Sequence, residues 1–498
     1  MATRSSGNSI LLWCADSLPP SPDLHWVPCF QNYSCARLEV PLEYGDPSRD
    51  VTSIAFLKLS AINATSNTCS LLTNPSGPGG SGIESVFSQG PALAGILQGQ
   101  HNIVGFDPRG VGLSGLSVDC WPGNPEGRAQ FEKLYYPEIY NASSTAAGRQ
   151  FAAAELFGDA CSSTVGGSNG SAAFVSTPAV ARDMLSFVEA EQKQRLAEHE
   201  SDNEPAKLWY YGVSYGTVLG ATFAHLFAGR VERMVLDGVV DAEDYYSLGW
   251  RSNLYDADKA LDSFESCAFW GPSVHNIRSR LDALLQDLKY SPIPIPPSVT
   301  SCPLPMLATH SDLKRYGNTT AYEIAVTGGT IPANPCNYAP STATTDVDTL
   351  IKCVDSAALT GERFRNISPF EDYVDILTPR SEFFGEVWPN NANGVACRAF
   401  KVSPPESGKL KGSNLDSRRT ANPILFLTTE VDPVAPKRGA LKMSSVFPGS
   451  AVLTQRSVGH TAFVSPSSCF VQRARKNLLS GQLPPSNSTC QADAEPFQ

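Results

Sequence analysis

The chain has 498 residues, which is enough for two or three average domains or for one large domain with a substantial insertion. Its content of 42% hydrophobic and 17% charged residues is ordinary for globular proteins. Its formal net charge of -11 argues against a nucleic-acid partner, because binding phosphate requires clustered lysine and arginine. No apolar run approaches the roughly 18 residues that a membrane helix needs, so we expect no membrane segment.

The N-terminal segment and the cysteines bear on the compartment. Arg4 is followed by only a short apolar stretch, Ile10–Trp13, which makes a poor signal peptide. Thirteen cysteines suggest disulfides and an oxidising compartment, and the absence of a Cys-x-x-Cys pair leaves zinc ribbons unsupported. We favour the secretory route, with the cytosol as the alternative. Seven N-glycosylation sequons fit secretion, with chance occurrence in a chain rich in Asn, Ser and Thr as the alternative; they lie at Asn32, Asn63, Asn141, Asn169, Asn318, Asn366 and Asn487.

The first half of the chain predicts a sheet covered by helices. Cys35–Tyr44 and Val51–Leu59 alternate apolar with polar or β-branched residues and are expected to be strands. Short apolar runs then alternate with helical patterns such as Pro178–Gln192, which is typical of a mostly parallel sheet with helices on both faces. The expected parallel strands are Cys69–Thr73, Asn102–Phe106, Leu208–Tyr211 and Met234–Leu236.

A glycine-rich loop, Asn74–Gly82, follows the first of these strands and permits two interpretations. From Gly77 it spells Gly-x-Gly-x-x-Gly, and Asp107 ends the next strand, so a dinucleotide-dependent enzyme is the rival hypothesis. Pro78 removes a backbone donor from the turn, and Asp107 continues into a structured turn through Ser114, which both disfavour the rival. In a hydrolase, the N–H of Gly77 would instead serve an oxyanion hole.

The segment Tyr210–Gly216 predicts a nucleophile. It reads Gly-x-Ser-x-Gly between a strand and a helix, and small residues on either side of Ser214 permit the sharp turn that exposes its hydroxyl. The N–H of Tyr215 would then be the second oxyanion donor. Gly166–Gly170 fits the same pattern, but no strand precedes it and it contains a sequon, so we expect a loop there.

The alternation of strands and helices stops near Asp244 and resumes near Val395. Between them the sequence is helical in places and rich in proline around Tyr290–Pro305, which indicates an inserted, mainly helical cap. The predicted organisation is a core over residues 1–243, a cap over 244–395 and the rest of the core over 396–498. Strands are expected at Asn422–Thr428 and Ala451–Gln455, and a closing helix at Phe470–Leu479.

The acid and base follow in the order that the α/β-hydrolase fold requires. In this fold the chain supplies serine, then the acid, then histidine, each after a later strand. Asp432 follows the strand that ends at Thr428, and His460 is the only histidine beyond it. We therefore predict a triad in which His460 takes the proton of Ser214 and Asp432 orients the imidazole.

With these residues identified, the chain resembles the tripeptidyl aminopeptidase-like branch of the proline-iminopeptidase clan. The resemblance covers nearly the whole chain and is weakest across the cap. It departs from the family at Ser76, where a glycine is common, and at Thr461, where a small residue or cysteine is usual. The motifs that carry it are His25–Cys29, Cys35–Leu42, Asn74–Gly82, Asp107–Ser114, the Ser214 elbow with Val235–Val239, Asp432–Pro436, Ser468–Cys469 and Gly481–Pro484 ahead of Cys490.

The resemblance implies release of short peptides or residues from free N-termini through an acyl-enzyme, without metal or cofactor. It also implies disulfides Cys29–Cys35 and Cys469–Cys490, with Cys353–Cys397 as a looser pairing. An esterase, amidase or lactonase acting on a small molecule is the alternative, and an inactive scaffold is disfavoured because all three triad residues are present.

An enzyme that requires a free N-terminus must recognise a charged ammonium group, and recognition away from bulk water requires a carboxylate. The acidic run Asp241–Asp244 lies where the chain enters the predicted cap. Glu243 and Asp244 are therefore candidate substrate-binding residues, with a solvated acidic turn as the alternative.

Overall fold

A computed structural model describes residues 18–65, 68–135, 138–198, 204–263, 273–295, 306–314, 342–357, 364–391, 394–410 and 415–494. The predicted segments Ile10–Trp13 and Asn318 lie outside these residues. No helix among the described residues has the length and apolar character to cross a membrane.

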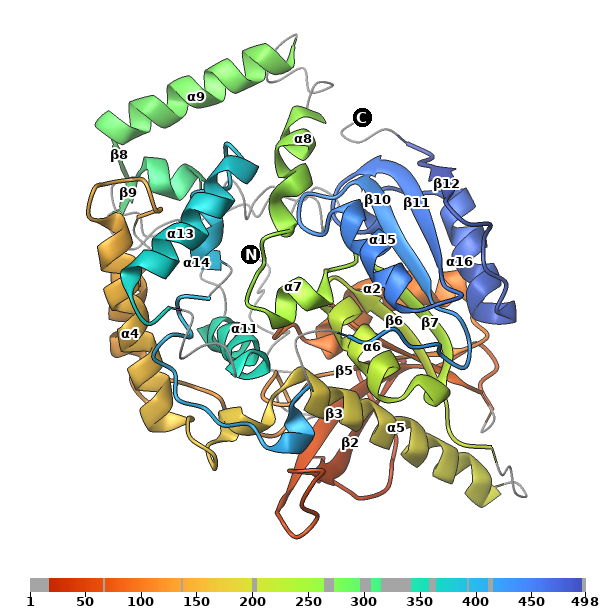
Figure 1. The fold of residues 1–498 in the computed structure, drawn as a ribbon. Helices are drawn as coiled ribbons and strands as arrows, with labels where there is room; N and C mark the ends of the chain where they lie inside the picture. Colours follow the sequence, from red (N-terminus) through yellow and green to blue (C-terminus); the bar gives the residue numbers. More distant parts are fainter. Residues whose placement is uncertain are drawn as a thin grey trace.

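A ten-stranded sheet organises the molecule, in the order β1-β2-β3-β5-β4-β6-β7-β10-β11-β12 (Figure 1). The strands β1, β2 and β3 run antiparallel to their neighbours, and every pairing from β5 to β12 is parallel. The bounds of the strands are β1 Val27–Cys29, β2 Tyr33–Pro41, β3 Val51–Leu59, β4 Ser70–Asn74, β5 Asn102–Phe106, β6 Leu208–Val213, β7 Val231–Asp237, β10 Leu425–Val431, β11 Ala451–Val458 and β12 Ser488–Gln491. A separate hairpin joins β8 (Ile293–Ile295) to β9 (Met306–Ala308).

The helices that the structure describes fall into two groups, five packed on the sheet and the others mainly outside it (Figure 1). Those on the sheet are α2 (Gly82–Ile96), α5 (Thr177–Glu198), α6 (Tyr215–Leu226), α15 (Lys437–Val446) and α16 (Ser468–Ser480). The others are α3 (Pro125–Tyr135), α4 (Ala146–Thr164), α7 (Ala242–Tyr246), α8 (Ala257–Asp262), α9 (Val274–Tyr290), α11 (Thr342–Asp355), α13 (Ile367–Leu377) and α14 (Trp388–Asn391).

Successive residues of each strand enter two different cores. In β3, Ile54 and Phe56 join the core beneath α5, α6 and α15, whereas Leu57 joins the core beneath α2 and α16. In β10, Phe426 enters the first core and Leu425 the second. Because side chains alternate across a strand, a strand buried on both faces must be apolar throughout, as the short apolar runs predicted.

The predicted strands are confirmed, with differences only at their ends. The strand expected over Asn422–Thr428 is β10, which is shifted by three residues to Leu425–Val431. The strand expected over Cys35–Tyr44 is β2, which ends at Pro41. It ends there because the carbonyls of Pro41 and Leu42 accept hydrogen bonds from the Arg109 guanidinium, at 2.7 Å each. The predicted helices lie within α5, α6 and α16, so the expected α/β architecture is confirmed.

A helical layer lies beside the sheet and includes α4, α11 and α13 (left in Figure 1). The helix α4 precedes the nucleophile in sequence, yet it packs against α13, and a Cβ added at Gly158 would lie 2.6 Å from Ala399. A buried ion pair of 2.6 Å joins Arg128 of α3 to Asp346 of α11. We propose that this layer is the cap, built from residues 244–395 with the addition of α3 and α4.

Four disulfides join described cysteines. Cys29–Cys35, Cys469–Cys490 and Cys353–Cys397 are the three that the resemblance implied. The fourth, Cys120–Cys161, was not predicted and ties the chain before α3 to α4. Two of the four therefore lie in the helical layer.

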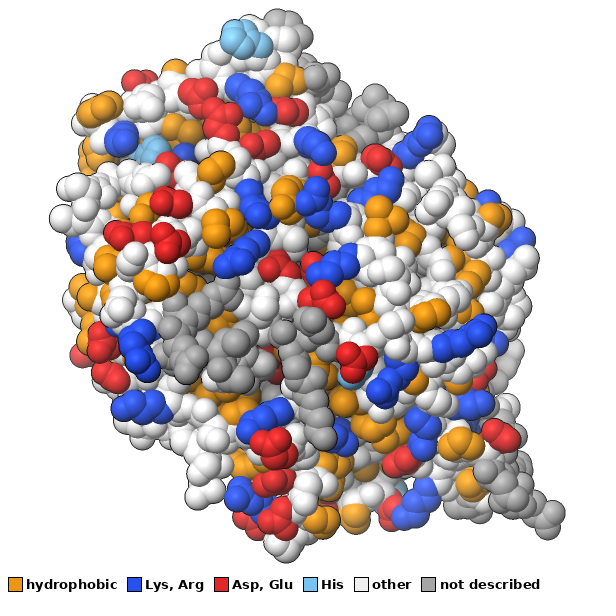
Figure 2. All heavy atoms as spheres, viewed as in Figure 1, with side chains coloured by type: hydrophobic (Ala, Val, Ile, Leu, Met, Phe, Trp, Pro, Cys, Tyr) orange, Lys and Arg blue, Asp and Glu red, His pale blue; other side chains and the backbone are white. Residues whose placement is uncertain are grey.

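Charge on the surface is mixed in sign. Figure 2 shows lysine and arginine side chains interspersed with aspartate and glutamate over the visible face. Many are paired across elements, as in Arg278 with Asp262 and Glu382. The described residues of this face therefore form no basic stripe of the kind that follows a phosphate backbone.

Candidate active site

The predicted nucleophile stands on a strained turn at the end of β6. Ser214 has φ 55° and ψ -117°, between the last residue of β6 and the first of α6, and is only 4% exposed. A Cβ added at Gly212 would lie 2.4 Å from the carbonyl oxygen of Gly216, and one at Gly216 would lie 2.4 Å from that of Asn74. Glycine is thus required on both sides of the serine, which is the physical content of the Gly-x-Ser-x-Gly pattern.

Asp432 and His460 meet as the sequence predicted. Asp432 follows β10, His460 follows β11, and both are buried. The imidazole Nδ1 lies 2.9 Å from both carboxylate oxygens of Asp432. The carboxylate also accepts from the N–H groups of Val434 (2.9 Å) and Ala435 (2.8 Å). An imidazole that donates through Nδ1 presents its Nε2 as an acceptor, which is the tautomer that a general base needs.

The loop that carries His460 is itself strained. Thr461 has φ 74°, a left-handed conformation that β-branched residues rarely adopt. Its N–H donates to Asp432 at 3.2 Å, so the same carboxylate that holds the imidazole also holds the next residue. Local strain that is fixed by surrounding hydrogen bonds is frequent at functional sites.

Asp237 connects the elbow to the histidine loop, and the sequence analysis gave it no role. Its carbonyl oxygen accepts from the N–H of Ser214 at 2.9 Å, and its carboxylate accepts from the N–H of Ala462 at 3.0 Å. The hydroxyl of Tyr211 donates to the same carboxylate at 2.9 Å. Burial raises the pKa of Asp237 to about 6. The signal in the sequence was an acidic residue directly after the apolar run Met234–Leu236.

Gly238, the next residue, lies against the imidazole. A Cβ added there would lie 3.1 Å from His460 Cε1 and 2.9 Å from Thr461 Cγ2. The backbone of Ser214 and the ring of His460 therefore both border the segment Asp237–Gly238. This segment brings the predicted nucleophile and base to one place at the carboxyl edge of the sheet.

The glycine-rich loop lies on the elbow, where an oxyanion hole is expected. The close approach of Gly216 to Asn74 fixes the start of the loop, and the Ser76 hydroxyl donates to Ser214 Oγ at 3.2 Å. Tyr215 is the first residue of α6, so its N–H has no acceptor within the helix. These contacts agree with Gly77 and Tyr215 as oxyanion donors, and that role stays a prediction.

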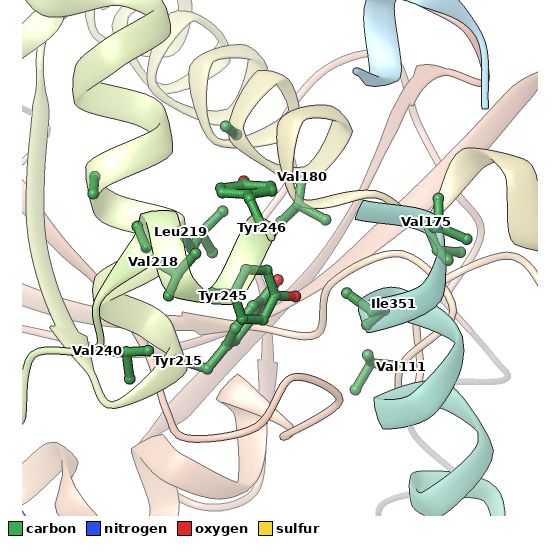
Figure 3. Packing of buried hydrophobic residues seen from close by; sticks show 14 of the residues in the cluster. Val111, Val175, Val180, Tyr215, Val218, Leu219, Val240, Tyr245, Tyr246 and Ile351 are labelled. Atoms are coloured by element: carbon green, nitrogen blue, oxygen red, sulfur yellow. The ribbon is translucent and has the colours of Figure 1, made fainter. Parts of the chain in front are cut away.

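The ring of Tyr215 joins a buried polar cluster that links the core to the helical layer. Its hydroxyl lies 2.6 Å from Thr177 Oγ1, and the N–H of Thr177 donates to Asp355 of α11 at 2.7 Å. The Tyr245 hydroxyl donates to the same carboxylate at 2.7 Å, and burial raises the pKa of Asp355 to about 7. Figure 3 shows the rings of Tyr215 and Tyr245 side by side, facing the helix that carries Ile351.

Glu243 and Asp244, the predicted substrate-binding residues, both have partners within the chain. Glu243 forms a 2.8 Å ion pair with Lys442. Asp244 accepts from the N–H and the hydroxyl of Ser252, each at 2.8 Å. Their part in substrate binding stays a prediction, and an incoming ammonium group would compete with Lys442 for Glu243.

The features that favoured a dinucleotide-binding unit have structural explanations. Asp107 accepts from the hydroxyl of Ser81 (2.6 Å) and the N–H of Leu113 (2.9 Å), so it ties the glycine-rich loop to the turn that follows β5. Burial raises its pKa to about 6.

The second Gly-x-Ser-x-Gly match follows a helix, α4, and its Ser168 is exposed, as expected for a loop.

Comparison with known proteins agrees with this geometry. Residues 381–490 match the family described as TAP-like protein. Serine protease Hip1 of Mycobacterium tuberculosis is 26% identical over 94% of this chain and 91% of its own. Tripeptidyl aminopeptidase of Streptomyces lividans is 24% identical over 95% of this chain and 87% of its own. Carboxylesterase B of M. tuberculosis is 24% identical over 92% of this chain and 86% of its own.

Proposed function

Taking the chain as a serine hydrolase of the α/β-hydrolase fold with a TAP-like C-terminal region, we propose that it is an aminopeptidase that releases short peptides or residues from free N-termini. The observation that carries the proposal is the buried His460–Asp432 pair beside the Ser214 elbow. The relatives named as a serine protease and a tripeptidyl aminopeptidase, which align with nearly the whole chain, support the peptide substrate.

The proposed route is acyl transfer. Ser214 Oγ forms a bond to the substrate carbonyl carbon, its proton passes to His460 Nε2, and the carbonyl electron pair becomes an oxyanion. Collapse of this intermediate breaks the bond to the leaving amine, which takes the proton from His460. Water then repeats the sequence on the acyl-enzyme. Asp432 keeps Nδ1 protonated and stabilises the imidazolium that forms.

A substrate panel tests the peptidase. Purified enzyme is given amino-acid and tripeptide anilides with free or acetylated N-termini, together with short-chain esters. We expect the free-amine anilides to be cleaved with a kcat/KM at least about tenfold above their acetylated counterparts, because a charge-reading subsite adds on the order of 1.4 kcal/mol or more. Labelling by a fluorophosphonate should vanish in Ser214→Ala and persist in the matched control Ser168→Ala.

An esterase, amidase or lactonase acting on a small molecule is the second candidate. The relative named carboxylesterase B favours it. The same panel separates the two, because an enzyme that cleaves acetylated anilides and simple esters as well as free-amine peptides has no subsite for the ammonium group. Equal rates on the two anilide series would therefore replace the first proposal by the second.

We also propose that the protein enters the secretory route and is glycosylated. Four disulfides suit an oxidising compartment, and the asparagines of the six sequons within the described residues are all exposed. A secretory host should yield protein whose mass falls on treatment with an N-glycosidase. An unchanged mass would contradict glycosylation.

A further inference from the structure

Ser76, in the glycine-rich loop, touches the nucleophile directly. Its Oγ lies 3.2 Å from Ser214 Oγ. The loop holds it there, because a Cβ added at Gly80 would lie 2.1 Å from the Ser76 carbonyl oxygen, and the preceding Asn74 abuts Gly216. The hydroxyl thus stands in a folded turn braced against the elbow. Where the resembling family commonly has glycine, this chain has an additional polar group at the reacting atom.

The direction of this hydrogen bond follows from the chemistry of Ser214. A serine hydroxyl donates one hydrogen bond and accepts two. The single proton of Ser214 must face His460 Nε2 if the imidazole is to take it. Ser76 is therefore the donor and Ser214 Oγ the acceptor.

We propose that the Ser76 hydroxyl is a third donor to the oxyanion, beside the N–H groups of Gly77 and Tyr215. When Ser214 Oγ bonds to the substrate carbon, it becomes an ester-like oxygen and a weak acceptor. The negative charge appears on the carbonyl oxygen, which is bonded to that same carbon. A hydroxyl can rotate, so the donor that faced Ser214 Oγ turns to the oxyanion and its proton stays on Ser76 throughout.

Such a donor acts on the transition state more than on bound substrate. Its acceptor before attack is a neutral hydroxyl, and after attack it is an anion, to which hydrogen bonds are stronger. Only interactions that strengthen in the transition state raise kcat. The inference depends on acyl transfer at Ser214 and holds for a peptide or an ester substrate.

The test compares Ser76→Ala, Ser76→Gly and Ser76→Thr, with Ser168→Ala as a matched control. We expect alanine and glycine to lower kcat by about 10- to 100-fold on both an ester and an anilide, with KM nearly unchanged, since one oxyanion donor is typically worth this or more. Threonine retains the hydroxyl and should stay within about threefold of wild type. The control should match wild type.

A trifluoromethyl ketone inhibitor separates a catalytic role from a structural one, because Ser214 converts it into an anionic tetrahedral adduct. Its Ki should rise in Ser76→Ala and Ser76→Gly by the same factor as kcat falls, whereas the Ki of a product-like competitive inhibitor stays constant. Unchanged or raised kcat would overturn the proposal, as would a loss of kcat without a matching rise in the ketone Ki. Activity retained in Ser214→Ala would instead refute the acyl route itself. The melting temperature verifies that each variant folds. If Ser76→Ala does not fold, the comparison of Ser76→Gly with Ser76→Thr still tests the proposal.

Discussion

At the scale of single residues, Asp237 joins the Ser214 elbow to the loop that carries His460, although it belongs to neither. Its carbonyl fixes the N–H of Ser214 and its carboxylate fixes the N–H of Ala462, two residues after the proposed base. Its hydrogen bonds among the described residues reach Ser214 N–H, Tyr211 and Ala462 but not the imidazole, so we propose that it is a positioning residue. Its effect on rate would come from the mutual placement of nucleophile and base, to which catalysis is sensitive at the scale of an ångström.

Asp237→Asn tests this role. An amide offers one acceptor oxygen where the carboxylate offers two, so the Tyr211 hydroxyl and the Ala462 N–H would have to share that oxygen, and neither would bond to a charged group. We expect kcat to fall about 10- to 100-fold with KM little changed, as a misplacement of about 1 Å would cause. Steady-state kinetics on an ester measure it, and Asp282→Asn on the exposed side of α9 is the control. Wild-type kcat in folded Asp237→Asn would refute the role.

Asp432→Asn should be more damaging. The amide donates to Nδ1 and so favours the imidazole tautomer with its proton on Nε2, which cannot take the proton of Ser214. We expect kcat to fall by about 10⁴. The fold should persist, because the amide oxygen can still accept from Val434 and Ala435. A loss smaller than that of Asp237→Asn would mean that Asp432 is not the acid of the triad.

At the scale of elements, a buried ion pair anchors α5 to the sheet. Arg109 Nε lies 2.6 Å from Asp183 Oδ2, a second guanidinium nitrogen lies 2.6 Å from Oδ1, and both side chains are buried. The same guanidinium bonds the carbonyls at the end of β2. Asp183→Asn leaves a buried charge without its counter-ion, which typically costs about 3–5 kcal/mol.

Urea denaturation measures this cost: Asp183→Asn should unfold at a lower urea midpoint, with an unchanged dependence of the unfolding free energy on urea concentration. Asp23→Asn is the matched control, because it removes the exposed Lys193–Asp23 pair, and exposed pairs contribute little. We expect its midpoint to equal that of wild type. Equal midpoints for the two variants would show that the Arg109–Asp183 pair does not stabilise the fold.

Asp355 connects α11 to α5 and α7, and it gives stability a pH dependence. Its pKa is raised to about 7 by burial, whereas an aspartate in an unfolded chain titrates near 3.9. Between about pH 4 and 7 the unfolded chain releases this proton and the folded protein keeps it, so stability falls as pH rises, by up to about 1.4 kcal/mol per unit. Below and above that window, Asp355 does not make the unfolding free energy depend on pH.

Asp355→Asn cannot titrate, so its unfolding free energy should fall less between pH 4 and 7 than that of wild type. Denaturant midpoints at intervals of one pH unit give the two curves. Other buried carboxylates with raised pKa values, among them Asp107, Asp183 and Asp237, are present in both proteins, and the difference therefore isolates Asp355. Curves that stay parallel across the window would contradict the raised pKa.

The limits of sequence analysis are clearest for these elements. The strands and the order of Ser214, Asp432 and His460 were predictable because short apolar runs and strand-end loops are local features. The packing of α4 against α13 and the disulfide Cys120–Cys161 were not, because they join segments far apart in the chain that carry no local signal for one another. Asp237 was missed for the same reason, since its function lies in contacts with two distant loops.

At the scale of the whole molecule, the disulfides brace the helical layer. Cys120–Cys161 and Cys353–Cys397 have sequence separations of 41 and 44 residues. Loops of that length lose enough chain entropy on crosslinking to stabilise the fold by about 4 kcal/mol each. We expect a reductant to lower the melting temperature and to raise KM before kcat, because the proposed cap loosens ahead of the core. Equal melting temperatures with and without reductant would contradict the bracing.

The intact mass of the protein after alkylation without reduction gives the number of free thiols. Four disulfides use eight of the thirteen cysteines, so at most five should react in protein that has not been reduced. Cys69 is one of them, since it is a free thiol in the structure. More than five labels on active protein would contradict the pairing.

The order of strands also sets when activity can arise during synthesis. β7 and β10 are neighbours, yet the paired residues Val235 and Leu425 are 190 positions apart in the chain. A growing polypeptide therefore carries the Ser214 elbow long before it carries Asp432 or His460. At the usual speed of a ribosome this interval is on the order of tens of seconds. A nascent chain, or one cut short by a premature stop, would hold the proposed nucleophile without the proposed base and would leave the cell's own peptides intact.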